Sequence, residues 1–201
     1  MHIIDLGALS LGAFHSPRFT LFAPKQTARE TADQSPVFFL NSKTGYVEDP
    51  LVGLRVLMID SDFYSGLRSN LYAKFQSGAS LILYEMGVGY GERMAAAIQE
   101  MGAGRIEVYK KFMERGKHQG YGEFRVPILQ SIISGLKGEA KVYLKDSFFA
   151  HSAGKTGKVE CWIVAGMIAG AGKKILAKEA TCIEEKCMSK GDPQCEFRLK
   201  S

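Results

Sequence analysis

The chain has 201 residues, a formal net charge of +5, 46% hydrophobic residues and four cysteines. This length suffices for one domain with its own hydrophobic core, or for one domain with an extension, without disulfide staples. No apolar run reaches the roughly 18 residues of a transmembrane helix, and the basic residues alternate with acidic ones. We therefore expect no membrane span and no direct nucleic-acid interface.

The cysteines are too few and too unevenly spaced for a secreted disulfide scaffold. The first residues lack the basic region and the small-residue cleavage site of an export signal. The sequence therefore predicts a cytoplasmic protein whose cysteines are reduced.

Residues 1–50 have an irregular pattern, with short β-like runs at 18–22 and 37–40. They carry no motif with recognisable chemistry. We interpret residues 1–50 as an N-terminal extension and residues 51–201 as the main domain.

The main domain begins with a predicted strand and two helices. The apolar run from Leu54 to Ile59 predicts a buried strand, and residues 60–62 offer capping side chains for a helix that ends before Gly78. Apolar residues at three-and-four spacing then predict a long central helix over residues 81–98, which would carry most of the core.

Two pairs of glycines stand one helical turn apart, Gly87 with Gly91 and Gly166 with Gly170. Glycine inside a helix costs up to about 1 kcal/mol relative to alanine, so these positions need a reason. The pattern predicts either that the two helices cross at close range or that both leave room for a bound molecule.

The second half predicts a helix at 106–113, a strand at 124–128 with an antiparallel partner at 141–149, a helix at 158–172, and strands at 175–184 and 194–200. In the last strand Cys195, Phe197 and Leu199 alternate with charged residues, so Cys195 should face the core. The expected fold class is α/β (α+β), an antiparallel sheet packed against a layer of helices.

A possible metal motif lies near the C-terminus. Glu184, Cys187 and Cys195 surround a turn at residues 191–193, and Cys161 would fall in the first turn of the 158–172 helix, where a thiolate is favoured. Thiolates and one carboxylate suit zinc. Free buried thiols and a Cys187–Cys195 disulfide remain alternatives, and Cys182 could replace Glu184 as a ligand.

The run Glu-x-x-Cys-x-x-x-Gly-Asp-x-x-Cys-x-Phe from Glu184 to Phe197, together with residues 146–150 and with Cys161 followed by Gly166 and Gly170, resembles the 4-vinyl reductase domain family. The resemblance covers residues 51–201 and is strongest after residue 141. This family includes the sensory domains of bacterial activators that respond to phenols and methylbenzenes, and it is similar in fold to TRAPP-type tethering subunits.

The resemblance implies a C-terminal zinc-binding helix-hairpin subdomain. Its four ligands would be Cys161, Glu184, Cys187 and Cys195, as in the aromatic-sensing members. Because the protein fills all four positions, such a zinc would be structural and not a Lewis-acid catalyst.

The sequence also indicates an apolar pocket between helix and sheet. The residues expected to line it are Tyr84, Val88, Phe112, Tyr143, Phe148 and Trp162. The resemblance implies that this pocket takes up a small hydrophobic or aromatic molecule.

No catalytic set emerges from the sequence, since the four histidines have no paired spacing. The function we expect is therefore a zinc-stabilised sensor or carrier of a small hydrophobic or aromatic molecule, acting as a homodimer. An enzyme or accessory protein acting on a tetrapyrrole vinyl group is the alternative, although no nicotinamide, flavin or redox-dithiol signature is present. A TRAPP-like scaffold subunit is a further alternative.

Overall fold

The computed structural model describes residues 38–49, 54–127 and 139–201, all within a compact unit that spans Pro36–Ser201. The elements in chain order are β1 (Phe39–Asn41), β2 (Tyr46–Asp49), β3 (Leu54–Val56), α1 (Ser61–Phe75), α2 (Gly78–Glu100), α3 (Arg105–His118), β4 (Glu123–Arg125), β5 (Ala140–Lys145), α5 (Phe148–Ala153), α6 (Trp162–Leu176), β6 (Thr181–Lys186), the 3-10 turn η1 (Met188–Lys190) and β7 (Cys195–Lys200). The mixed α/β class with antiparallel sheets is confirmed.

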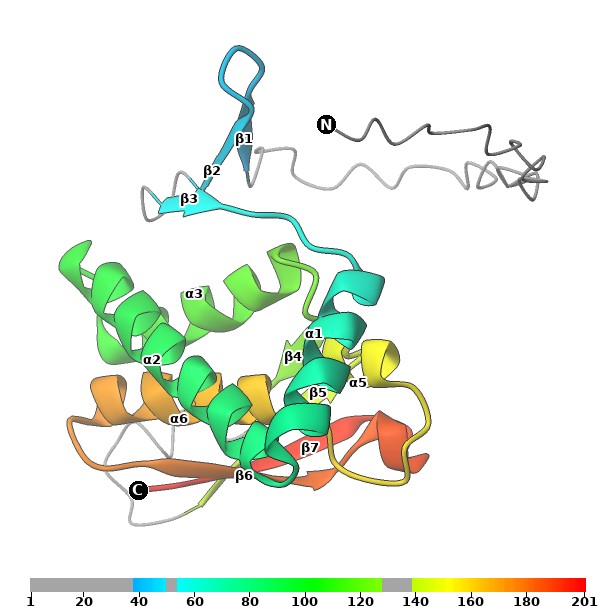
Figure 1. Ribbon diagram of the computed structural model, residues 1–201. Helices are drawn as coiled ribbons and strands as arrows, with labels where there is room; N and C mark the ends of the chain where they lie inside the picture. Colours follow the sequence, from blue (N-terminus) through cyan, green and yellow to red (C-terminus); the bar gives the residue numbers. More distant parts are fainter. Residues whose placement is uncertain (1–37, 50–53, 128–138) are drawn as a thin grey trace, which may run out of the picture. The chain divides into compact units, whose positions relative to one another are not determined.

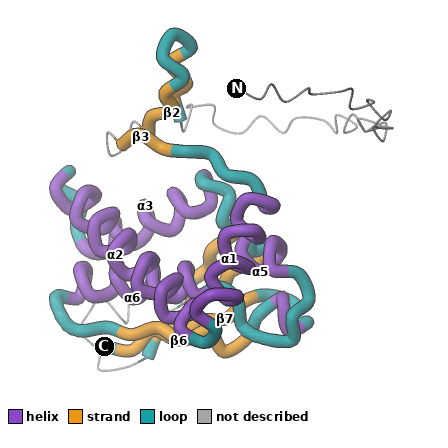
Figure 2. The backbone as a smooth tube through the Cα atoms, in the orientation of Figure 1, coloured by secondary structure: helices purple, strands orange, loops and turns teal. Residues whose placement is uncertain are grey.

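The strands form two antiparallel sheets, one with the order β1-β2-β3 and one with the order β4-β5-β7-β6. In the larger sheet the side chains alternate between a buried and a more exposed face. Val142 and Leu144 of β5 and Cys195, Phe197 and Leu199 of β7 are all buried, which confirms the predicted inward face of the last strand. Helix α6 lies over this face, and α2 lies over α6 (Figure 1), while Figure 2 shows the helices gathered on one side of β6 and β7.

Helices α2 and α6 cross with their backbones in contact at the two glycine pairs. A Cβ atom on Gly87 would collide with the carbonyl oxygen of Ile163, and one on Gly166 would collide with that of Tyr84. Gly91 and Gly170 are confined in the same way. Of the two explanations for the glycine pattern, the close helix crossing is therefore the correct one.

The strand predicted at Leu54 to Ile59 is shorter and more exposed than expected. Strand β3 ends at Val56, and Leu57 and Met58 are 82% and 78% exposed. Helix α1 then begins as predicted, with the Asp60 carboxylate accepting a hydrogen bond from the Phe63 amide at 2.7 Å. The apolar run failed as a guide to burial because these residues border a cavity described below.

Helix boundaries in the C-terminal half also differ from the prediction. The Ser147 hydroxyl caps α5 by accepting from the Ala150 amide at 3.3 Å, so the chain turns into a helix where the strand 141–149 was expected to continue. Helix α6 begins at Trp162, which makes Cys161 its N-cap, and it extends through Ile175, which had been assigned to a strand. The predicted run at 18–22 and the position Ile128 lie outside the described residues.

Strand β2 pairs with β3 across the predicted division between residues 50 and 51. The side chains of Asp49 in β2 and Arg115 in α3 form an ion pair in which both partners are almost fully buried. In the ranges that the structure describes, no helix is both long and apolar enough to cross a bilayer.

Candidate metal centre and apolar cavity

Four potential metal ligands meet at the start of α6. Cys161 is the N-cap of that helix, Glu184 lies in β6, Cys187 follows β6, and Cys195 begins β7. One donor atom from each residue lies within 4.8 Å of the other three, and all four residues are buried. The structure thus brings together the four predicted residues, whereas Cys182 is not part of this group.

The turn between β6 and β7 positions two of these sulfurs. The Asp192 carboxylate accepts a hydrogen bond from the Cys187 amide at 2.8 Å, and the Asp192 amide donates back to the Cys187 carbonyl at 3.2 Å. Gly191 has a φ of 101°, a conformation that a residue with a side chain rarely adopts. The Gly-Asp pair of the sequence motif therefore shapes the turn.

Glu184 joins the hairpin to the start of the helix. Its Oε2 atom accepts hydrogen bonds from the amides of Cys161 at 2.8 Å and Glu160 at 3.1 Å. Its Oε1 atom is buried and has no hydrogen-bond partner among the described residues. A buried carboxylate oxygen without a donor is costly, and coordination of a cation would satisfy it.

The sulfur spacing fits a metal site and not a disulfide. The Sγ atoms of Cys161 and Cys195 are 3.6 Å apart, whereas a disulfide requires about 2.05 Å. Tetrahedral zinc with Zn–S bonds of about 2.3 Å would place two sulfurs roughly 3.8 Å apart. All four cysteines are free thiols in the structure, so the predicted Cys187–Cys195 disulfide alternative is wrong.

Proton affinities show that the protein alone cannot hold four negative charges in this space. Burial, together with the nearby Cys187 thiolate, raises the pKa of Glu184 to about 8. Hydrogen bonds from Cys161 and Cys195 lower the pKa of Cys187, because its thiolate accepts them. A divalent cation would compensate these charges, and the three sulfurs and one oxygen fit zinc.

The thiolate expected at Cys161 is not favoured by its position at the helix start. Its hydrogen bonds with Cys187 and Cys195, and then burial and the Glu184 carboxylate, raise the pKa of Cys161 well above its usual value. The Cys161 amide itself is taken by Glu184. The neighbouring carboxylate thus outweighs the helix dipole in the metal-free protein.

Two further contacts at the centre were not predicted from the sequence. The Ser147 hydroxyl lies 3.3 Å from the Cys161 sulfur. Arg68 of α1 pairs with Glu160, the residue before Cys161. Ser147 belongs to the family motif but nothing indicated its role, and Arg68 lies 92 positions from its partner, beyond any local pattern.

An apolar cavity of about 490 Å³ lies beside α6 and α1. Its lining residues are Phe38, Val47, Val56, Leu57, Met58, Ile59, Tyr64, Leu67, Met86, Tyr90, His118, Gln119, Tyr121, Phe148, Phe149, Ile163 and Met167. Aromatic rings form one wall, where Tyr64 meets Phe149 edge-on with ring centroids 5.1 Å apart. A cavity of this size and composition suits a small apolar ligand.

The cavity has few polar groups. The Tyr90 hydroxyl accepts a hydrogen bond from the Gln119 amide at 2.9 Å. The Tyr64 hydroxyl is buried and has no hydrogen-bond partner among the described residues. Burial raises the pKa of both phenols, so they are neutral hydrogen-bonding groups at physiological pH.

Of the six residues predicted to line a pocket, only Phe148 lines this cavity. Tyr84 and Val88 contribute their backbones to the helix crossing, and Phe112 is buried in the core. Tyr143 borders a separate hollow beside Arg125. Trp162 is the first residue of α6.

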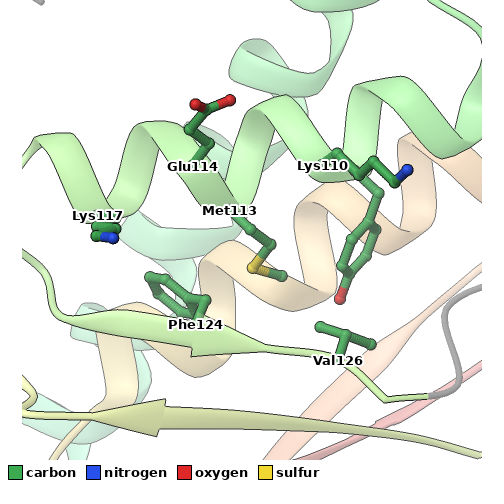
Figure 3. Close-up of a pocket in the computed structure, with 7 residues that line it drawn as sticks. Lys110, Met113, Glu114, Lys117, Phe124 and Val126 are labelled. Atoms are coloured by element: carbon green, nitrogen blue, oxygen red, sulfur yellow. The ribbon is translucent and has the colours of Figure 1, made fainter. Parts of the chain in front are cut away.

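A second hollow, of about 370 Å³, lies between α3 and β4 (Figure 3). Met113 and Phe124 form an apolar floor, with Val126 beside them, while Glu114 points away from the strand. Lys110 and Lys117 also border it. Its border is more charged than that of the apolar cavity, and it does not adjoin the four-ligand cluster.

Comparison with known proteins supports the resemblance predicted from the motif. The family model of the 4-vinyl reductase domain matches residues 141–201. Two uncharacterized proteins of Methanocaldococcus jannaschii, MJ0150 and MJ0745, are each 28% identical to this chain over 61% of its length. The matched regions cover 65% and 57% of those proteins, so the chain spans about three-fifths of the curated relatives it matches.

Two solved structures share the fold. The phenol-responsive sensory domain of the transcription activator PoxR, solved with phenol, has a TM-score of 0.69 at 19% identity and covers 82% of this chain and 84% of its own. A vinyl-4-reductase family protein from Methanocaldococcus jannaschii has a TM-score of 0.54 at 17% identity, with coverages of 72% and 83%. These likenesses establish the fold alone.

Proposed function

Since residues 141–201 carry a 4-vinyl reductase domain, we propose that this chain is a metal-stabilised sensor or carrier domain for a small apolar or aromatic molecule. The observation that carries the proposal is the cavity of about 490 Å³ with aromatic walls, set against the helix whose N-cap belongs to the four-ligand cluster. The family match and the likeness to a phenol-responsive sensory domain fit a ligand-binding sensor domain.

The proposed role of the metal is structural. Zinc held by Cys161, Glu184, Cys187 and Cys195 would have four protein ligands and no open position for a substrate. It would fix the β6–β7 hairpin to the start of α6. Binding of roughly 10 to 16 kcal/mol, as in small zinc modules, would then appear as folding stability.

The proposed ligand is a neutral molecule with a largely hydrophobic body and one hydrogen-bonding group. An apolar body would contact Phe148, Ile163 and Met167. The Tyr64 hydroxyl, or the Tyr90–Gln119 pair, would orient its polar group.

The setting of the domain completes the proposal. Residues 51–201 would be the ligand-binding domain and residues 1–50 an extension, of which Phe38 and Val47 border the cavity. We propose a cytoplasmic homodimer, so that a bound ligand could change the contact between subunits or with a separate partner. The four free cysteines are consistent with a reducing compartment.

The experiment combines native mass spectrometry with titration by two probes, phenol and 1-naphthol. We expect one zinc per chain, and saturable binding of at least one probe. Ile163→Trp should abolish probe binding by filling the cavity, whereas Ile183→Trp, at a 47% exposed position in β6, should leave it unchanged. Absence of binding to both probes would overturn this ligand class, and a tetrapyrrole or another absorbing cofactor in the purified protein would favour the enzyme.

A further inference from the structure

We propose that helix α1 couples the apolar cavity to the metal centre through the Arg68–Glu160 ion pair, so that metal occupancy and cavity occupancy strengthen each other. The metal side of this inference stands on the ligand cluster alone. The ligand side rests on the proposed function. Arg68 and Glu160 are thereby positioning residues, since neither is a metal donor nor lines the cavity.

The ion pair is bidentate and enclosed. The Arg68 Nε atom donates to Glu160 Oε2 at 2.9 Å, and its NH2 group contacts Oε1. The side chains of Arg68 and Glu160 are only 14% and 3% exposed. Removing one partner of such a pair leaves a buried charge without compensation, so the two elements that carry it are held together firmly.

On the metal side, Glu160 is tied directly to the cluster. Its amide donates to Glu184 Oε2 at 3.1 Å, and the next residue, Cys161, supplies a sulfur. A shift of Glu160 therefore moves two of the four donor residues. Precise placement of donors by groups that do not touch the ion is a general determinant of metal affinity.

On the cavity side, α1 forms part of the wall. Tyr64 and Leu67 line the cavity, and Tyr64 precedes Arg68 by four residues, which puts both on one face of the helix. Tyr64 is 1% exposed and contacts Phe149 at 5.1 Å between ring centroids. A molecule in the cavity would thus restrain the helix turn that presents Arg68 to Glu160.

This arrangement makes the coupling reciprocal. If zinc strengthens ligand binding by some factor, the ligand must strengthen zinc binding by the same factor. Factors of about 5 to 150 are typical of such coupling. The physical requirement is an element whose order both sites affect, and α1 is the helix that contacts both.

The first test needs no ligand. Amide hydrogen exchange of the full chain is measured with zinc and after removal of zinc by a chelator. Although α1 supplies no donor, we expect zinc to slow exchange in residues 61–75 by about fivefold or more. In Arg68→Met this zinc-dependent slowing should disappear from α1 while the hairpin at residues 184–197 keeps it.

Matched variants separate coupling from general stability. Arg68→Lys keeps the charge but loses the two-pronged contact, so it should retain only part of the effect. Arg93→Met removes an exposed arginine from the neighbouring helix α2 and should leave the zinc response of α1 intact. If Arg68→Met fails to fold, the lysine variant still provides the comparison, and exchange of wild-type α1 that ignores zinc overturns the proposal.

The second test measures 1-naphthol affinity with and without zinc. We expect zinc to tighten binding by about fivefold or more in the wild type and by less than about twofold in Arg68→Met. Equal affinity in loaded and stripped wild type overturns the coupling while leaving the proposed function intact. If 1-naphthol binds neither form, this ligand class loses support, and the exchange experiment still decides whether the metal centre controls α1.

Discussion

The metal centre and the apolar cavity lie at neighbouring parts of one fold but are built on opposite principles. At the metal centre, four buried donors come from three segments, and amides of Glu160, Cys161 and Cys187 are bonded to nearby carboxylates. The cavity has few polar contacts, and Leu57 and Met58 at its border are 82% and 78% exposed. The first region is specified by chemistry that demands defined partners, and the second by shape and apolar surface.

Helix α6 belongs to both regions. Its N-cap, Cys161, enters the metal centre, while Ile163 and Met167 line the cavity. Gly166 lets α2 approach its backbone between them. A change in either region can therefore be read out in the other, and four experiments test how different the two regions are.

The largest effect is expected from breaking the metal centre. Cys187→Ser should reduce zinc content from one ion per chain to none, and should lower stability by at least about 4 kcal/mol, or roughly 10 °C in Tm. Elemental analysis and thermal unfolding measure both quantities. Cys182→Ala, at the buried cysteine outside the cluster, should keep the ion. Equal losses in both variants would mean that the cluster behaves as ordinary core.

Changing the helix crossing should have the next largest effect. Gly166→Ala forces a Cβ atom against the Tyr84 carbonyl and should cost roughly 3 kcal/mol of unfolding free energy. The matched control is Gly89→Ala, where a Cβ would meet no atom within 4 Å, so this change should stabilise by up to about 1 kcal/mol. Denaturant titration of both proteins distinguishes close packing from helix propensity, and a neutral Gly166→Ala would contradict the crossing.

The pH dependence should distinguish loaded from stripped protein. The folded pKa of Glu184 is about 8, above the ordinary 4.5, so without metal its contribution to stability is present at low pH and is lost as the pH rises toward 8. With zinc bound, the carboxylate is ionised and this loss does not occur. The stability gap between the two forms should widen by about 2 kcal/mol from pH 6 to pH 8. A gap that narrows would assign the wrong protonation state to Glu184.

The smallest effect belongs to the cavity wall. Tyr64→Phe removes a buried hydroxyl without a partner and should raise the stability of the ligand-free protein by about 1 kcal/mol, with zinc content unchanged. Tyr84→Phe removes a hydroxyl that accepts from the Cys182 amide at 3.1 Å, and should lower stability by about 1 kcal/mol. If Tyr64→Phe destabilises instead, the hydroxyl has a partner that gives the cavity a polar centre.

Much of the metal centre could be predicted from sequence because its information is local. Glu184, Cys187, Gly191 and Asp192 lie on one hairpin, where the turn chemistry and the two-residue period of the last strand place the side chains. The glycine pairs likewise predicted the close crossing of two helices. Cys161 joined the predicted set only through the family resemblance, since spacing along the chain could not bring it there.

The cavity and its link to the metal depended on tertiary structure. Apolar residues at 54–59 and along α1 indicate a strand and a helix, but the same hydrophobicity serves a core, an exposed surface or a cavity wall. Periodicity gives one face of an element and not what meets that face. Arg68 finds Glu160 across 92 positions only because α1 packs beside the start of α6. The sequence by itself determined the donor chemistry and the local turns, and the packing of helices decided where an apolar molecule could fit.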